Sequence, residues 1–222
     1  MEQLLTANVA TNLYWLGRYI ERVEETLLEI SSAYDKIIDV DKNAGAELYK
    51  QFDIDIKYDN ALNFLNEAIL GEHNANLADI MGYARENAII CRSQIAADVF
   101  GEIIELHGLF QSVSKSALEI DYKFIDQAQS LISEIWGGVS KREHRKYSDY
   151  FIRLGQLVEE GDLNLRLNRN DELTPILIDE IDTIIQILAP DAKLEELAFY
   201  AKQDKDEIIN MINNKIEKVV VE

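Results

Sequence analysis

The sequence predicts an all-α fold, a single-domain helical bundle with long helices. Apolar residues recur at three- and four-residue steps along most of the 222 residues, and this is the helical period. The ten glycines and two prolines are too few for a β sandwich or barrel, which needs a turn about every 8 to 12 residues. Because 47% of the residues are hydrophobic, we expect residues 1–222 to bury one large core.

The first half of the chain predicts four helical segments. The first long helix starts at Thr6 and ends near the segment DVDKNAG. A short amphipathic piece at 46–52 is followed by a helix at 61–70 that Gly71 closes. Asn74 or Asn76 can cap the next helix. Residues 76–113 keep the helical spacing throughout and predict one central helix.

The second half continues in the same way. A pattern at 120–136 predicts a helix, and Gly137 and Gly138 predict its C-terminal stop. Residues 141–169 predict another long helix. After Pro175 and Pro190, shorter C-terminal helices are expected within 174–219.

One internal similarity relates the first and fifth long helical segments. The stretch LYWLGRYIERVEETLLEI from Leu13 aligns without gaps with FIRLGQLVEEGDLNLRL from Phe151, at a spacing of 138 positions. Two copies predict a pseudo-twofold bundle, in which these two helices can face each other. The alignment matches Gly17 with Gly155, Glu21 with Glu159, and Glu24 with Asp162.

Composition excludes several classes of partner. The formal charge of −19 repels nucleic acid and anionic membrane surfaces. No apolar run reaches the ~20 residues that span a bilayer, and the start MEQLLTANVATN does not resemble a signal peptide. A cytoplasmic location is therefore expected.

Cofactor and metal chemistry find little support in the residue pattern. The lone Cys91 excludes an intramolecular disulfide and is expected in the core. His73, His107 and His144 are scattered along the chain, so we predict no metal site. No glycine-rich phosphate loop occurs in the sequence, and no cofactor is predicted.

Several charged residues are predicted to point inward. At about 100° per residue, Glu24 lies near the centre of the apolar stripe of the first helix, with Glu21 on its flank and Arg18 on the far side. The same spacing places Arg85 and Arg92 in the stripe of the central helix. A buried charge needs a partner, and the following set is the candidate cleft: Glu21, Glu24, Arg85, Arg92, Glu159 and Asp162.

Two interpretations of this set remain open. The charges can form a buried network that only fixes how the helices pack. Alternatively, the arginines and carboxylates line a cleft that binds a carboxylate, phosphate or peptide group, because guanidinium groups recognise anions in a bidentate manner.

Three stretches, NLYWLGRYIERVEET, ARENAIICRSQI and YFIRLGQLVEEGDLNLRL, resemble the bacterial alpha-E family, an all-helical family named for a Glu-Arg motif. The motifs lie within residues 8–168. Four positions depart from the pattern, since Gln156 and Glu160 stand where arginines are expected, and Ile89 and Ser93 interrupt the charged pattern of the middle motif. The matching positions, beyond the cleft residues named above, are Asn12, Tyr14, Trp15, Gly17, Arg18, Arg22, Glu86, Asn87 and Gly155.

The resemblance implies which proteins the chain is associated with, but not which reaction it performs. Alpha-E proteins accompany circularly permuted ATP-grasp ligases and transglutaminase-like proteins, which suggests peptide or amide-bond metabolism. We therefore expect a component of a peptide-ligation or peptide-processing system that holds a charged peptide or its activated terminus. The alternative is a non-catalytic scaffold that recruits the ligase, and whether the chain is an enzyme stays open.

An apolar strip at Trp15 and Tyr19 also allows a homodimer. In the alternative, the C-terminal helices cover this strip.

Overall fold

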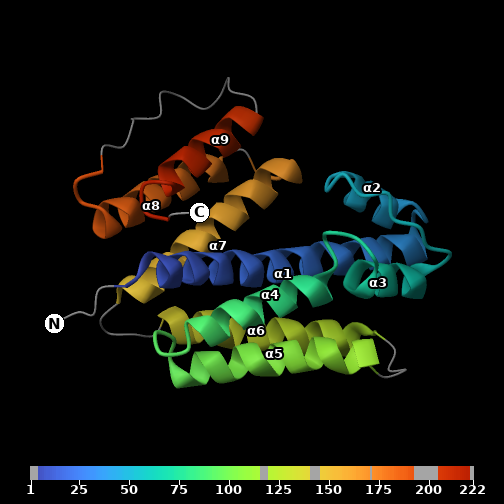
Figure 1. The fold of residues 1–222 in the computed structure, drawn as a ribbon. Coiled ribbons are helices and arrows are strands. Elements are labelled where there is room, and N and C mark those ends of the chain that lie inside the picture. Colours follow the sequence, from blue (N-terminus) through green and yellow to red (C-terminus); the bar gives the residue numbers. More distant parts are fainter. Residues whose placement is uncertain (1–4, 116–119, 141–145, 171, 193–204, 221–222) are drawn as a thin grey trace. The chain divides into compact units, whose positions relative to one another are not determined.

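The computed structural model describes residues 5–115, 120–140, 146–170, 172–192 and 205–220. Within these ranges the chain forms α-helices and no strand, which confirms the all-α fold class (Figure 1). None of the helices in this part of the chain has the length and apolar character needed to cross a membrane. The helices are α1 (Ala7–Asp39), α2 (Ala44–Lys50), α3 (Ala61–Leu70), α4 (Leu77–Ile90), α5 (Ala97–Lys115), α6 (Tyr122–Ser140), α7 (Tyr147–Arg166), α8 (Leu173–Leu188) and α9 (Lys205–Ile216).

The chain divides into two compact units. The first unit consists of Met1–Glu21 and Glu143–Glu222, and it holds the beginning of α1 together with α7, α8 and α9. The second unit, Arg22–Arg142, holds the rest of α1 and the helices α2 to α6.

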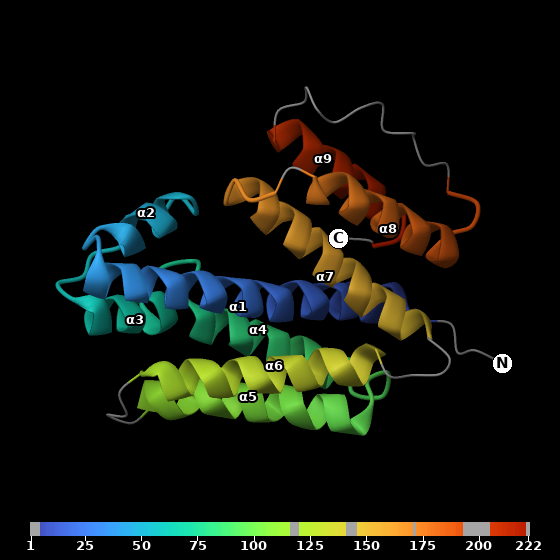
Figure 2. The same cartoon turned by 180° about the vertical axis from the view of Figure 1, so that it is seen from behind.

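In the second unit, α5 and α6 lie side by side, and α4 packs on α5 and α3 (Figure 2). The prediction that Gly137 and Gly138 end the helix is wrong, because α6 continues to Ser140. A Cβ atom on Gly138 would lie 2.5 Å from Cγ2 of Val99 on α5. Gly138 therefore allows close packing of the two helices instead of ending one of them.

The predicted central helix at 76–113 is divided into α4 and α5 by a turn after Ile90, so this prediction is also wrong. In the turn, the N–H of Gln94 donates to the carbonyl of Cys91 at 2.8 Å. Apolar residues keep the helical spacing on both sides of the turn, so the periodicity could not detect it. Cys91 is fully buried, as predicted, and burial raises the pKa of its thiol to about 11.

The start of α4 also resolves the choice of cap. The side chain of Asn76, not that of Asn74, accepts a hydrogen bond from the N–H of Asp79 at 2.8 Å. This is the usual N-cap geometry.

In the first unit, α7, α8 and α9 pack against one another. The predicted helix at 141–169 is present as α7, and residues 141–145 lie outside the described residues. Pro175 lies in the first turn of α8, where a missing N–H removes no helical hydrogen bond. Lys215 of α9 donates to both carboxylate oxygens of Asp182 on α8 at 2.6 Å. These contacts fix α9 beside α7 and α8.

Candidate functional site

The candidate site is built on a close crossing of α1 and α7 through two glycines. A Cβ atom on Gly17 would overlap the carbonyl oxygen of Ile152, and one on Gly155 would overlap the carbonyl oxygen of Tyr14. Tyr14 and Ile152 are themselves equivalent in the internal repeat. The crossing is therefore reciprocal, and it confirms the prediction that the two repeated helices face each other.

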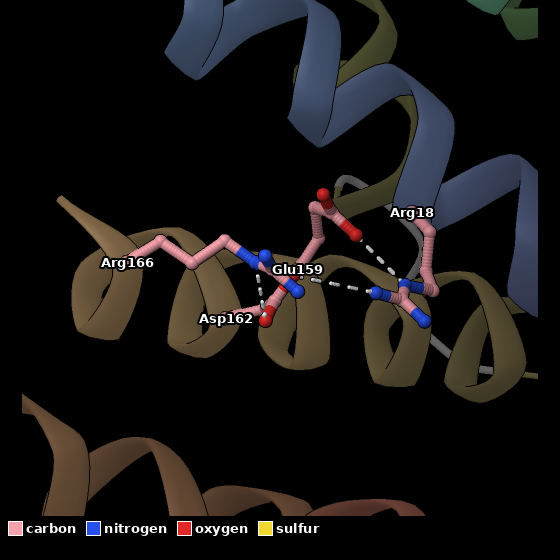
Figure 3. Close-up of polar contacts among 4 residues, drawn as sticks. All are labelled: Arg18, Glu159, Asp162 and Arg166. Atoms are coloured by element: carbon pink, nitrogen blue, oxygen red, sulfur yellow. Dashed lines mark hydrogen bonds and ion pairs between the residues drawn. The ribbon is translucent and has the colours of Figure 1, made fainter. Parts of the chain in front are cut away.

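Arg18 bridges this crossing. Its Nε donates to Oε2 of Glu159 at 2.7 Å, and its Nη2 lies 3.9 Å from Oδ2 of Asp162 (Figure 3). The side chain of Arg18 is 13% exposed, whereas that of Glu159 is fully buried. The far side of the first helix, where Arg18 is predicted, allows either solvent exposure or an interface, and the structure shows an interface because α7 covers that side at the glycine crossing.

Two aromatic rings complete the surroundings of Arg18. Its guanidinium carbon lies 4.9 Å from the ring centroid of Trp15 and 5.9 Å from that of Tyr14. Trp15 is half-buried and also packs against Tyr19. Stacking on the rings and bonding to Glu159 hold the guanidinium in one orientation.

The charge state of Arg18 follows from these neighbours. Burial alone would lower the pKa of the guanidinium, but the opposite charge of Glu159, with smaller contributions from Tyr14 and Asp162, outweighs it. The pKa of Arg18 is raised above its ordinary value. Arg18 therefore stays a cation at any pH at which the protein folds.

A second arginine approaches Asp162 from the same helix. Nε of Arg166 lies 3.0 Å from each carboxylate oxygen of Asp162, an i,i+4 pair on α7. Figure 3 shows Asp162 in contact with both guanidinium groups, Arg18 on one side and Arg166 on the other. We call Arg18, Glu159, Asp162 and Arg166 the charge cluster; its formal charges, two positive and two negative, balance.

A cavity of about 210 Å³ opens beside the charge cluster. Arg18, Asp162 and Arg166 supply its charged lining, whereas Glu159 does not reach it. Its remaining lining comes from α7 and α9 and consists of Val158, Ile209, Ile212 and Asn213.

The repeat is asymmetric at the position equivalent to Arg18. Gln156 stands there, and its Oε1 accepts from Nη1 of Arg153 at 2.7 Å. Arg153 in turn donates to both carboxylate oxygens of Glu180 on α8, at 3.0 and 3.1 Å. Glu21, the equivalent of Glu159, is buried. The pseudo-twofold crossing is therefore asymmetric. Arg18 of the first copy bonds Glu159 of the second, whereas Gln156, the equivalent of Arg18, has no charge with which to pair Glu21.

The structure brings together only part of the predicted cleft. Glu159 and Asp162 are buried as predicted, and their cationic neighbours are Arg18 and Arg166. Glu24 belongs to the second unit, where its Oε2 accepts from Nε1 of Trp136 at 2.6 Å.

The prediction that Arg85 and Arg92 point into the core is wrong. The side chain of Arg85 is 35% exposed and pairs with the neighbouring Glu86. Arg92 follows the end of α4, so the helical spacing no longer determines its direction. It is exposed, and its guanidinium carbon lies 4.2 Å from the ring centroid of Phe100.

Alanine replacements of Arg92 and Glu24 should therefore act independently. The changes in the free energy of unfolding should add to within about 0.5 kcal/mol, because the two side chains have different partners. Thermal unfolding of the two single variants and the double variant measures this. A coupling energy of about 1 kcal/mol or more would show that they interact.

The other positions of the resemblance lie outside the charge cluster. Nδ2 of Asn12 donates to the carbonyl of Asn8 at 2.7 Å, and the carbonyl of Asn87 accepts from the N–H of Cys91 at 3.0 Å. Arg22 is half-buried, and the side chain of Glu86 is 63% exposed.

Arg166 is the site residue that the sequence analysis missed. A signal was present, because Arg166 follows Asp162 by four residues on a predicted helix, a spacing at which opposite charges meet. The roles of Ile209 and Asn213 had no such signal, because they depend on how α9 packs.

Comparison with known proteins gives one match. A family model, Alpha-E, described as a predicted alpha-helical domain with a conserved ER motif, matches residues 5–187. In this chain, Glu21 and Arg22 form the Glu-Arg pair of the first motif. The comparisons with curated proteins and with solved structures find no match.

Proposed function

The chain belongs to the Alpha-E family, and on this premise we propose that it is the helical component of a peptide-ligation or peptide-processing system. Its task there is to hold a charged peptide, or the activated terminus of one, for an ATP-grasp-type ligase or a transglutaminase-like protein. The observation that carries this proposal is the cavity lined by Arg18, Asp162 and Arg166.

The size of the cavity favours a peptide end over a larger ligand. Small-molecule and cofactor sites usually measure about 300–1,000 Å³, whereas this cavity measures about 210 Å³. One terminal residue is closer to this size than a nucleotide. The apolar walls can bury a side chain, while the charged residues orient the polar end.

A second candidate function is a scaffold whose buried charges serve the fold alone. The Arg18–Glu159 bond favours it, because Glu159 is fully buried and lies away from the cavity lining. The two roles meet at Arg18, because its Nε bonds Glu159 while the residue also lines the cavity.

Co-expression with the ATP-grasp-type ligase tests the proposal. We expect the two proteins to co-purify, and the chain to raise peptide-dependent ATP turnover by the ligase several-fold. Arg166→Gln should keep the association and lose the peptide-dependent gain. Arg153→Gln is the matched control, because Arg153 is also a half-exposed, ion-paired arginine of α7 but does not line the cavity.

The outcomes separate the two candidates. If Arg166→Gln stimulates the ligase as well as the unchanged protein does, the scaffold replaces the peptide-holding role. If the proteins neither associate nor affect ATP turnover, the partnership is refuted.

A further inference from the structure

The two arginines beside the cavity retain hydrogen-bonding capacity. Each guanidinium uses its Nε for an intramolecular hydrogen bond, Arg18 to Glu159 and Arg166 to Asp162. Among the described residues, no Nη atom of either arginine donates a hydrogen bond, and Nη2 of Arg18 lies 3.9 Å from Oδ2 of Asp162, beyond hydrogen-bond length. The Nη groups can therefore donate to a ligand.

The anionic group in the cavity is already engaged. Both carboxylate oxygens of Asp162 lie within hydrogen-bond distance of Arg166, and its side chain is 11% exposed. A cationic ligand would have to displace Arg166 to bind Asp162. An anionic ligand can accept hydrogen bonds from the Nη groups without breaking any bond of the charge cluster.

The overall charge favours an anion of low charge. The charge cluster is balanced, and the chain carries −19, which disfavours a polyanion such as a nucleotide. A single carboxylate placed between the two arginines gains charge-assisted hydrogen bonds with the least repulsion.

The other walls select what is attached to that carboxylate. Val158 and Ile212 are buried, Ile209 is half-buried, and all three line the cavity. Burying an aliphatic side chain against them is favourable in proportion to the apolar area removed from water. Asn213 adds an amide that can bond a peptide group.

From these contacts we infer that the cavity binds the C-terminal carboxylate of a peptide that ends in a small aliphatic residue. The carboxylate accepts hydrogen bonds from the Nη groups of Arg18 and Arg166, and the last side chain lies against Val158, Ile209 and Ile212. This inference rests on the proposed function and specifies which end of the peptide is held. Two of the three apolar residues, Ile209 and Ile212, come from α9, which lies beyond residues 5–187 matched by the family model.

Calorimetric titration with three peptides tests the inference. The first is N-acetyl-Gly-Gly-Val with a free carboxylate, the second is its C-terminal amide, and the third is Gly-Gly-Val amide with a free amine. The free acid should bind at least ~10-fold more tightly than the other two, because a hydrogen bond to a charged group contributes about 1.5–3 kcal/mol.

Variants locate the binding. Arg166→Gln should weaken binding of the free acid at least ~10-fold, and Arg153→Gln should leave it unchanged. Ile209→Ser should reduce the preference for a terminal valine over a terminal glycine while keeping the preference for a carboxylate. Melting curves of each variant show whether it is folded.

Each outcome decides the inference. If the free-amine peptide binds best, the inference is overturned while the proposed holding of a peptide terminus stands. Equal binding of all three peptides, no binding of any, or an equal loss in Arg166→Gln and Arg153→Gln also overturns it. Association with the ligase is measured separately by co-purification. A failure of the proposed function can therefore be distinguished from a failure of this inference.

Discussion

Replacement of Arg18 by methionine should lower the free energy of unfolding by about 3–5 kcal/mol, the usual loss when one partner of a buried ion pair is removed. The reason is that Glu159 is fully buried and would lose the cation that its Oε2 contacts at 2.7 Å. Methionine keeps most of the volume, so the loss reports charge rather than packing. Denaturant unfolding of the purified variant measures it.

A double-mutant cycle identifies the cause. Adding Glu159→Gln to Arg18→Met should recover about 1–3 kcal/mol relative to the sum of the single changes, because the buried carboxylate that has lost Arg18 is then removed. Arg153→Met is the control, since the Arg153–Glu180 pair is 31% and 42% exposed and contributes no more than about 1 kcal/mol. Equal losses in Arg18→Met and Arg153→Met would contradict the bridging role of Arg18.

The second large effect is expected at the glycine crossing. Gly155→Ala should lower the free energy of unfolding by about 1–3 kcal/mol, although alanine is the better helix former. A Cβ at this position would overlap the backbone carbonyl of Tyr14, which cannot move aside as a flexible side chain can. The two helices must therefore separate.

Gly161 on the same helix is the matched control. A Cβ there would lie 3.9 Å from Ile212 and Leu177, which is ordinary contact. Gly161→Ala should therefore be neutral or stabilise the protein by up to about 1 kcal/mol. Equal melting temperatures of the two alanine variants would show that the crossing tolerates a side chain and that the close approach is unimportant.

The fold was largely predictable because it depends on local signals. Helical spacing predicted the bounds of α3 and the start of α1 to within one residue, and it placed the end of α1 near the segment DVDKNAG, whose first residue is Asp39, since an amphipathic helix repeats its apolar face every few residues. The internal repeat also predicted one tertiary contact, between the segments that contain Gly17 and Gly155. The reciprocal close approach of the two backbones confirms it.

The errors arose where a packing neighbour, not the local pattern, decides the outcome. Glycine is typical of a helix end, but at position 138 the missing side chain leaves room for Val99 of α5. Arg92 has the spacing of a buried residue but follows a turn that the spacing cannot detect. The spacing of Arg18 allows either an exposed residue or an interface, and the crossing helix α7 decides for the interface.

The two carboxylates of the site were predictable from the sequence, but its two arginines were not. Glu159 and Asp162 follow from the repeat, because they occupy the positions of Glu21 and Glu24. The repeat gives Gln156 as the match of Arg18, so it could not indicate that Arg18 bonds across the crossing. The cavity depends further on α9, whose place beside α7 is set by tertiary contacts such as Lys215 with Asp182.

The central claim is that Arg18 and Arg166 both face a cavity that holds the carboxylate end of a peptide. The most direct measurement is an NMR titration of the protein labelled with ¹⁵N-arginine, in which the guanidinium signals of Arg18, Arg166 and Arg153 are followed while N-acetyl-Gly-Gly-Val is added. The account predicts that the signals of Arg18 and Arg166 shift together and saturate, while that of Arg153 stays in place. A shift at Arg153 of equal size, or no shift at Arg18 and Arg166, would contradict it.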